Sequence, residues 1–223
     1  MTVNFINKNN LKVLCRELSA ADGDMNIIFQ AFGVPPLWAR PHGFSTLIHI
    51  ILEQQVSLAS AQSAFDKLQT VLGKITPEGV LSLTDAEMKA AYFSRQKTVY
   101  ARELSTAVLE KRLIFEELDV LSDGEIRSEL VKIKGIGRWT ADIYLLMACL
   151  RPDVMPKGDL ALHTAWQKLE NLERRPNAEE FQQIAERWKP LRSVAARLLW
   201  HFYLSSKIKT AFRDSENPPH QLQ

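Results

Sequence analysis

Apolar residues recur along most of this chain at intervals of three and four, which places them on one face of an α-helix. Helix starts are marked by residues whose side chains can accept from the first backbone N–H groups: Thr76, Thr84, Ser122 and Asn177. A glutamate follows the last three of these at the third position, and a proline follows Thr76 directly. Gly33 and Gly73 mark helix ends. No run alternates apolar and polar residues as a half-buried strand does, so the predicted fold class is all-α.

The positions of these signals predict individual helices with ends uncertain by a few residues. We expect them near residues 9–20, 23–32, 44–54, 58–72, 77–82, 85–92, 95–111, 123–133, 138–150, 160–170, 178–187 and 190–208. No repeat, low-complexity segment or flexible linker divides the chain. Polar residues and two prolines near the end predict a frayed tail at residues 214–223.

Composition narrows the class of protein. The 223 residues are 46% hydrophobic and 24% charged, which is ordinary for a soluble globular protein. The net charge of +2 is too small for a polybasic nucleic-acid coat, so a nucleic-acid binder of this composition needs a local basic face. The N-terminus has no secretory pattern, and the apolar runs are too short to span a bilayer. These features predict a soluble intracellular protein, cytoplasmic in a bacterium or nuclear in a eukaryote, with no membrane partner.

The residues that usually bind metals or act as nucleophiles are sparse. The five histidines have no metal-ligand spacing, and the two cysteines, Cys15 and Cys149, are far apart in the sequence. We therefore expect no metal site and two reduced cysteines. The chain also lacks a phosphate-binding loop that ends in Gly-Lys-Ser/Thr and a Gly-x-Ser-x-Gly nucleophile turn.

One stretch carries most of the information about function. Residues 130–141 predict a helix, a tight glycine hairpin and a second helix, and Asp159 follows after a short loop. Gly135 and Gly137 are expected to supply backbone angles that a Cβ atom would forbid. They would also leave N–H groups uncovered at the start of the second helix, where a phosphate oxygen can bind. A phosphate anchor with an acid at a fixed distance indicates chemistry on nucleic acid.

These residues resemble the helix-hairpin-helix DNA glycosylases, within them the 3-methyladenine or alkylpurine branch. The pattern is Leu-x-x-Ile-x-Gly-Ile-Gly-Arg-Trp-Thr-Ala at 130–141, and segments 51–57 and 188–200 fit the same branch in the same order. The resemblance covers roughly residues 41–205. It implies one glycosylase domain over residues 1–213 with two helical lobes. About residues 41–150 would form the central lobe, and the N-terminal helices with residues 151–213 would form the second.

The resemblance assigns catalysis to Asp159. A carboxylate beside the anomeric carbon stabilises the positive charge that develops on the sugar, and it can orient or deprotonate the attacking water. The alternative is a helix N-cap, because Asp159 directly precedes an apolar helical run. Both roles are compatible in one residue.

The resemblance also assigns a pocket for the damaged base, with Trp139 and Trp200 as its aromatic residues. Bifunctional relatives carry a lysine at the position of Trp139, and tryptophan has no nucleophile. This implies hydrolysis by water without strand cleavage. Where relatives carry a second aromatic residue, this chain has Ile143. An apolar core position is the alternative for Trp139 and Trp200.

DNA contacts are expected at the hairpin and at the turn of residues 54–57. The predicted DNA-binding residues are Lys134, Gly135, Gly137, Arg138, Thr140, Gln54 and Gln55. Gln55 is the candidate wedge that fills the gap left by an extruded base, and Ser57 is expected to cap the next helix. Segment 94–97 and residues 192–193 are weaker candidates for phosphate contacts, with ordinary helix surface as the alternative.

The resemblance therefore implies a monofunctional DNA glycosylase for alkylated purines, of DNA-3-methyladenine glycosylase II type, with no lyase activity. Its expected partner is double-stranded DNA with damaged bases, and a monomer is expected. No iron–sulfur cluster is expected, because the four cysteines that hold it in some relatives are absent. A monovalent cation at the hairpin carbonyls is expected from the family. The alternatives are a glycosylase for deaminated or oxidised bases and a non-catalytic DNA-binding module.

Overall fold

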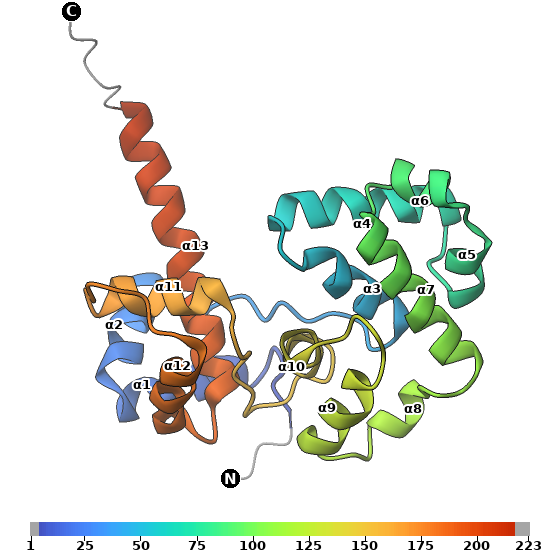
Figure 1. Ribbon diagram of the computed structural model, residues 1–223. Helices are drawn as coiled ribbons and strands as arrows, with labels where there is room; N and C mark the ends of the chain where they lie inside the picture. Colours follow the sequence, from blue (N-terminus) through green and yellow to red (C-terminus); the bar gives the residue numbers. More distant parts are fainter. Residues whose placement is uncertain (1–4, 217–223) are drawn as a thin grey trace, which may run out of the picture. The chain divides into compact units, whose positions relative to one another are not determined.

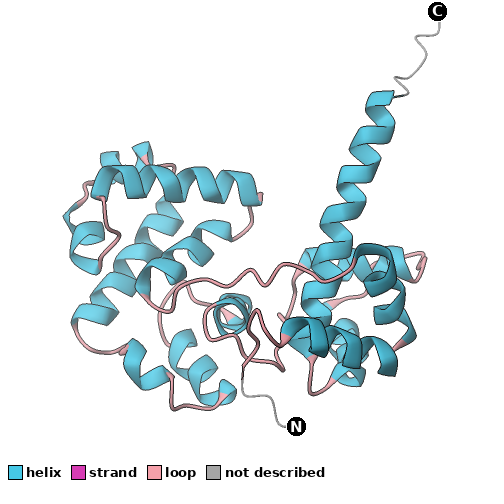
Figure 2. Cartoon of the chain, turned by 180° about the vertical axis from the view of Figure 1, so that it is seen from behind, coloured by secondary structure: helices cyan, strands magenta, loops and turns pink. Residues whose placement is uncertain are grey.

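The computed structural model describes the backbone of residues 5–216 and the side chains up to Ser205. Within that part of the chain every regular element is a helix, as Figure 2 shows. The predicted all-α fold class is therefore confirmed. None of the described helices is both long and apolar enough to cross a membrane. The chain divides into two compact units, one of residues 38–151 and one that combines residues 1–37 with residues 152–223.

The unit of residues 38–151 is built around a helix that has almost no polar face. Its helices are α3 (Phe44–Glu53), α4 (Leu58–Leu72), α5 (Pro77–Ser82), α6 (Asp85–Ala90), α7 (Arg95–Leu109), α8 (Phe115–Leu118), α9 (Asp123–Val131) and α10 (Arg138–Met147). In α3 the side chains of Leu47, Ile48, Ile50 and Ile51 are fully buried. Helices α4, α7 and α10 pack against α3 (Figure 1). Burial of this apolar surface is the main stabilising contribution to the unit.

The other unit joins the two ends of the chain. It contains α1 (Leu11–Ala21), α2 (Gly23–Phe32), α11 (Leu160–Leu169), α12 (Ala178–Ala185), the 3₁₀ helix η1 (Glu186–Trp188) and α13 (Arg192–Glu216). Helix α13 packs against α1, α2 and α11. Its first half buries five apolar side chains and one arginine completely: Val194, Ala195, Ala196, Arg197, Leu198 and Leu199. The apolar start of α13 thus forms the core of this unit.

The predicted helix starts are confirmed atom by atom. The side chains of Thr76, Thr84, Ser122 and Asn177 accept from the backbone N–H three residues ahead at 2.9 to 3.3 Å. The last three also form the reciprocal glutamate bond of a capping box. Gly33 and Gly73 end α2 and α4 with φ of +75° and +69°.

Two short helices and two helix ends differ from the prediction. The short helices α8 and η1 were not expected, because four and three residues are too few to show a period. Helix α10 ends at Met147 instead of residue 150. Helix α13 continues to Glu216, since no glycine or proline interrupts it before Pro218. Residues 214–216 are thus helical rather than frayed, and the rest of the predicted tail, 217–223, lies outside the described residues.

Candidate active site

The predicted hairpin lies between α9 and α10, at residues 132–137. Gly135 has a φ of +97°, a left-handed conformation that favours glycine. A Cβ atom at Gly135 would also overlap the Tyr100 side chain of α7. The Ile136 amide donates to the Ile133 carbonyl at 3.0 Å, and both isoleucine side chains are buried. Two apolar anchors and one obligatory glycine therefore fix the reversal of the chain.

Gly137 is glycine for a different reason. Its φ is −89°, an angle that any residue adopts, so the expectation that both glycines supply forbidden angles is wrong for Gly137. Gly137 is the exposed N-cap of α10, and no side chain caps the first N–H groups of that helix. Nothing lies within 4 Å of the position that its Cβ would take. The start of α10 therefore presents N–H groups and the positive end of a helix dipole, which suit an anion.

The side chain of Gln54 connects the turn after α3 to this hairpin. Its Nε2 donates to the Gly135 carbonyl at 2.9 Å and to the Thr140 hydroxyl at 3.0 Å. Thr140 is only 1% exposed. The predicted contacts of Gln54 and Thr140 with DNA stay predictions. Both side chains are occupied inside the unit, where they hold the turn against the hairpin.

The basic side chains of the hairpin differ in how far they are committed. Lys134 is exposed and, among the described residues, has no ion pair. Arg138 lies 3.3 Å from Asp142, one helical turn ahead, but its side chain is still 55% exposed. Asp142 is fully buried and also accepts from Arg127 at 2.7 Å. Lys134 is thus available to a ligand, whereas Arg138 would share its charge between Asp142 and any ligand.

The turn between α3 and α4 presents Gln55 to solvent. Gln55 has a φ of +57° and is exposed, as a side chain that enters DNA must be. Ser57 accepts from the Ser60 amide at 3.2 Å, which confirms that it caps α4. At the end of α3, the Leu52 carbonyl accepts from Lys97 Nζ at 2.6 Å. Burial lowers the pKa of the Lys97 amine. Lys97 therefore holds the turn and is not a free phosphate ligand.

The loop before α11 is attached to the first turn of α13. Arg192 donates to both carboxylate oxygens of Asp153 at 2.8 and 2.9 Å. The Ser193 hydroxyl accepts from the Val154 amide at 2.9 Å and donates to the Val154 carbonyl at 3.1 Å. Arg192 and Ser193 are thus neither phosphate ligands nor ordinary helix surface. They fix the segment that leads to Asp159.

Asp159 is the N-cap of α11, which confirms that structural role. Its Oδ1 accepts from the amides of Ala161 and Leu162, each at 3.0 Å. The indole Nε1 of Trp200, in α13, donates to the same oxygen at 3.2 Å. Asp159 is 8% exposed, as is Trp200. Three donors at a helix N-terminus therefore orient this carboxylate.

The three residues predicted for the base pocket belong to different units. Trp200 lies with Asp159 in the unit that holds α11 and α13. Trp139 and Ile143 lie one turn apart on α10, in the unit of residues 38–151. Trp139 is partly exposed, whereas Ile143 is buried. The structure therefore places Trp200 against Asp159, whereas Trp139 and Ile143 belong to the other unit.

The sequence matches a family model over residues 48–190, a range that contains the hairpin, the 54–57 turn and Asp159. The family is described as HhH-GPD superfamily base excision DNA repair protein. The chain belongs to this superfamily.

Several proteins that are similar to this HhH-GPD protein are named 3-methyladenine DNA glycosylases. It is 29% identical over 169 residues to DNA-3-methyladenine glycosylase 1 of Schizosaccharomyces pombe, which covers 74% of the chain and 73% of the relative. It is 29% identical over 184 residues to a DNA-3-methyladenine glycosylase of Bacillus subtilis, which covers 77% of the chain but only 58% of that relative. A Schizosaccharomyces pombe 3-methyladenine DNA glycosylase, solved in complex with abasic DNA, superposes with a TM-score of 0.80 at 26% identity. That match covers 87% of this chain and 97% of the other.

Two features of this HhH-GPD protein were not predicted from the sequence. The attachment of Arg192 and Ser193 to residues 153–154 joins segments 39 positions apart, and a helical period carries no such information. His163, one turn after Asp159, is buried, and its Nε2 has no hydrogen-bond partner among the described residues. Burial lowers the pKa of the His163 imidazole. The only available signal was its place on the apolar face of α11.

Proposed function

We propose that this protein is a monofunctional DNA glycosylase that hydrolyses the N-glycosidic bond of alkylated purines in duplex DNA. Bases of the 3-methyladenine and 7-methylguanine type are the proposed substrates, and an abasic site is the product. Membership of a base excision repair superfamily and the names of the relatives support this. The observation that carries it is the Asp159 carboxylate, which three donors hold at the start of α11.

The proposed role of Asp159 follows from the charge that develops in the reaction. When the bond between the sugar C1′ and the purine nitrogen breaks, its electron pair leaves with the base and positive charge builds on the sugar. A fixed carboxylate next to C1′ stabilises that charge. Water then forms the new bond to C1′ and loses a proton, which Asp159 can accept. The N-cap bonds supply the fixed orientation that this role requires.

The proposed substrates need little further help from the protein. Alkylation at a ring nitrogen makes the purine cationic, so it departs as a neutral base. Aromatic side chains can bind such a cationic ring by stacking and by a cation–π interaction. Trp200, whose indole is bonded to Asp159, and the partly exposed Trp139 are the proposed aromatic contacts. Ile143, the third residue proposed for the pocket, is buried in the unit of residues 38–151.

The absence of lyase activity is proposed on chemical grounds. Strand cleavage by this kind of enzyme needs an amine that attacks the sugar, and the indole of Trp139 is not a nucleophile. Wild-type protein should therefore leave abasic sites that break only after alkali treatment. Strand breaks that form without alkali would contradict this part of the proposal.

The DNA duplex is proposed to bind at the hairpin and the turn after α3. The N–H groups at the Gly137 end of α10, with Lys134 and part of the Arg138 charge, would hold a phosphate. Gln55 is the proposed wedge. The monovalent cation at the hairpin carbonyls and the monomeric state stay predictions. A repair enzyme would act where the DNA is, in the cytoplasm of a bacterium or the nucleus of a eukaryote.

The decisive experiment compares wild type with Asp159→Asn. Asparagine keeps the size of the side chain and can still accept from the Ala161 and Leu162 amides, so the fold should survive. We expect the wild type to release 3-methyladenine from methylated duplex DNA. The variant should release it at least about 100-fold more slowly while binding DNA normally. Equal rates of base release by wild type and variant would remove Asp159 from the mechanism. Release of neutral damaged bases, but not of methylated ones, would support a glycosylase for deaminated or oxidised bases.

Asp22 provides a matched control in the same unit. Like Asp159 it caps a helix, accepting from the Asp24 and Met25 amides, and it accepts from a tryptophan indole, that of Trp188 at 3.0 Å. It also pairs with Arg187 at 2.6 Å. Asp22→Asn should therefore lower stability but leave base release intact below the melting temperature. Loss of activity in both variants would mean that any disturbed N-cap inactivates the protein.

A further inference from the structure

Tyr92 occupies a backbone position that helices usually give to glycine. Helix α6 ends in a Schellman motif, because the Phe93 amide donates to the Met88 carbonyl at 3.1 Å and the Tyr92 amide donates to the Lys89 carbonyl at 3.0 Å. The motif requires a left-handed residue directly after the C-cap, and Tyr92, at that position, has a φ of +64°. A bulky side chain in this conformation is strained, and strain of this kind is a reason to look for a function.

Nothing in the fold of the described residues explains an aromatic ring at this position. Tyr92 is 66% exposed, and within the described part of the chain its side chain has no hydrogen bond, ion pair or ring contact. The apolar contact of the motif is made by its buried neighbours, Met88 and Phe93. A glycine would satisfy the backbone without strain.

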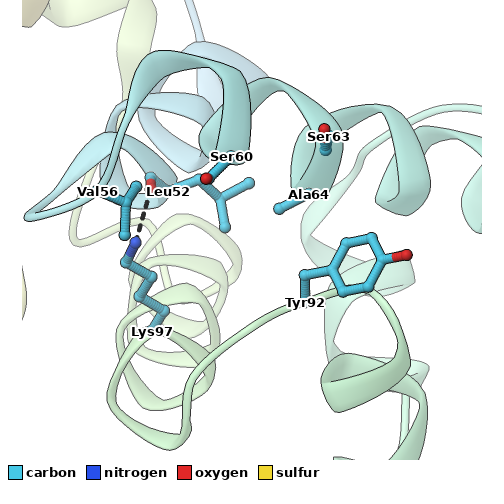
Figure 3. Close-up of a pocket in the computed structure, with 7 residues that line it drawn as sticks. All are labelled: Leu52, Val56, Ser60, Ser63, Ala64, Tyr92 and Lys97. Carbon is cyan, nitrogen blue, oxygen red and sulfur yellow. Dashed lines mark hydrogen bonds between the residues drawn. The ribbon is translucent and has the colours of Figure 1, made fainter. Parts of the chain in front are cut away.

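The Tyr92 ring borders a shallow hollow of about 270 Å³ next to the turn of residues 54–57. Figure 3 shows the ring near Ser63 and Ala64 of α4, across the hollow from Val56 and Lys97. The remaining lining residues are Leu52 and Ser60. The Lys97 amine is already bonded to the Leu52 carbonyl, which the dashed line in Figure 3 marks.

The chemistry of the lining suits an uncharged ring with a polar edge. Its seven side chains offer one aromatic face, apolar carbon, two serine hydroxyls and the Lys97 amine, which is already bonded to the Leu52 carbonyl, and none is a carboxylate. The hollow is smaller than the 300–1,000 Å³ typical of small-molecule pockets, so it fits a single ring system better than a whole cofactor. Aromatic faces and hydroxyls are the groups that bind unpaired nucleobases.

The position of the hollow indicates which base this is. Val56, in its wall, directly follows the proposed wedge Gln55. Extruding a damaged base leaves its former partner unpaired beside the wedge. We propose that the hollow receives this partner base of the undamaged strand, stacked on the Tyr92 ring. The proposal rests on the proposed function, since only a base-flipping enzyme creates such an unpaired base.

The test compares Tyr92→Gly and Tyr92→Phe on two duplexes that differ only opposite the lesion. Each duplex carries a tetrahydrofuran abasic analogue, opposite thymine in one and opposite a second tetrahydrofuran in the other. Tyr92→Gly should bind the thymine duplex about tenfold more weakly than wild type and the second duplex equally well. Tyr92→Phe should match wild type on both. Because the strain is removed, the melting temperature of Tyr92→Gly should rise by about 1–3 °C.

Asn171→Gly is the matched control, because Asn171 also has a positive φ, of +52°, but lies in the other unit. It should leave DNA binding unchanged. The proposal is overturned by an equal loss on both duplexes, by no loss, or by a fall in the melting temperature of Tyr92→Gly. If the wild type releases bases but Tyr92→Gly shows no selective loss on the thymine duplex, the proposed role of the hollow is wrong and the proposed reaction stands. If Tyr92→Gly shows that selective loss but the wild type releases no base, only the proposed reaction is wrong.

Discussion

At the scale of single residues, the two hairpin glycines show how one motif combines two physical requirements. Gly135 is needed for the fold, because its φ is +97° and a Cβ would overlap Tyr100. Gly137 has ordinary angles and open space around it. Its missing side chain leaves the first N–H groups of α10 accessible. The same substitution should therefore have opposite consequences at the two positions.

Gly135→Ala should lower the free energy of unfolding by about 2–4 kcal/mol, from backbone strain and overlap with Tyr100. Gly137→Ala should cost less than about 1 kcal/mol, the usual difference between glycine and alanine at an N-cap. Its affinity for duplex DNA should fall about tenfold, because the new methyl group obstructs a phosphate bond. Urea denaturation and DNA titration measure the two effects. A folded Gly137→Ala with full affinity would remove the α10 terminus from the DNA interface.

Residue identity in the sequence predicts some of these roles and not others. The caps at Thr84, Ser122 and Asn177 were readable because each depends on residues three positions away. The role of Asp159 as an N-cap was readable because the residue directly precedes an apolar helical run, while its catalytic role came from a resemblance and stays a prediction. The strain at Tyr92 could not be read, since it depends on how α6 ends against its neighbours.

At the scale of elements, the bonds of Gln54 join two segments that are 81 positions apart. Helical periodicity predicted α3 and α10, because each buries a regular apolar face. It gave no sign that a side chain after α3 would bond to the hairpin before α10. The expectation that Gln54 contacts DNA came from its place in the turn alone and stays a prediction, and it did not include this long-range pairing.

Gln54→Ala and Gln55→Ala should separate support of the hairpin from insertion into DNA. Gln54→Ala removes two hydrogen bonds and leaves the buried Thr140 hydroxyl without its donor. We expect a loss of about 1–2 kcal/mol in the free energy of unfolding, with weaker DNA binding. Gln55→Ala alters an exposed side chain, so its stability should change by less than about 0.5 kcal/mol while base release slows. Equal stability of the two variants would contradict the assigned role of Gln54.

At the scale of the whole molecule, the two compact units differ in how the chain builds them. Residues 38–151 form one unit from a continuous segment, whereas the other needs both ends of the chain. In that second unit Asp22 pairs with Arg187, 165 positions away. Composition and periodicity predicted helices for both segments but carried no information on such pairs, which only the folded chain brings together.

Each unit contains one histidine whose pKa is lowered by desolvation, the half-buried His49 and the buried His163, and these should make the protein sensitive to mild acid. Burial lowers the pKa of His49, which stacks on Phe65 at 4.2 Å, and Arg40 lowers it further against the opposing effects of Glu53 and Asp66. Burial likewise lowers the pKa of His163. A histidine with a lowered pKa in the folded state takes up its proton first in the unfolded chain. Stability is therefore present above about pH 6.5 and falls as the pH drops below it.

The free energy of unfolding should accordingly fall between pH 7 and pH 5, by no more than about 1.4 kcal/mol per pH unit for each histidine, since each binds one proton. The melting temperature should fall with it. Glu170 has the opposite sign, because burial and Asp24 raise its pKa and its contribution is lost as the pH rises. His163→Gln keeps a neutral polar side chain that binds no proton. It should therefore remove the contribution of His163 to the slope of the free energy of unfolding against pH. The double variant with His49→Gln should flatten it further. An unchanged slope in the double variant would assign the acid sensitivity to the carboxylates instead.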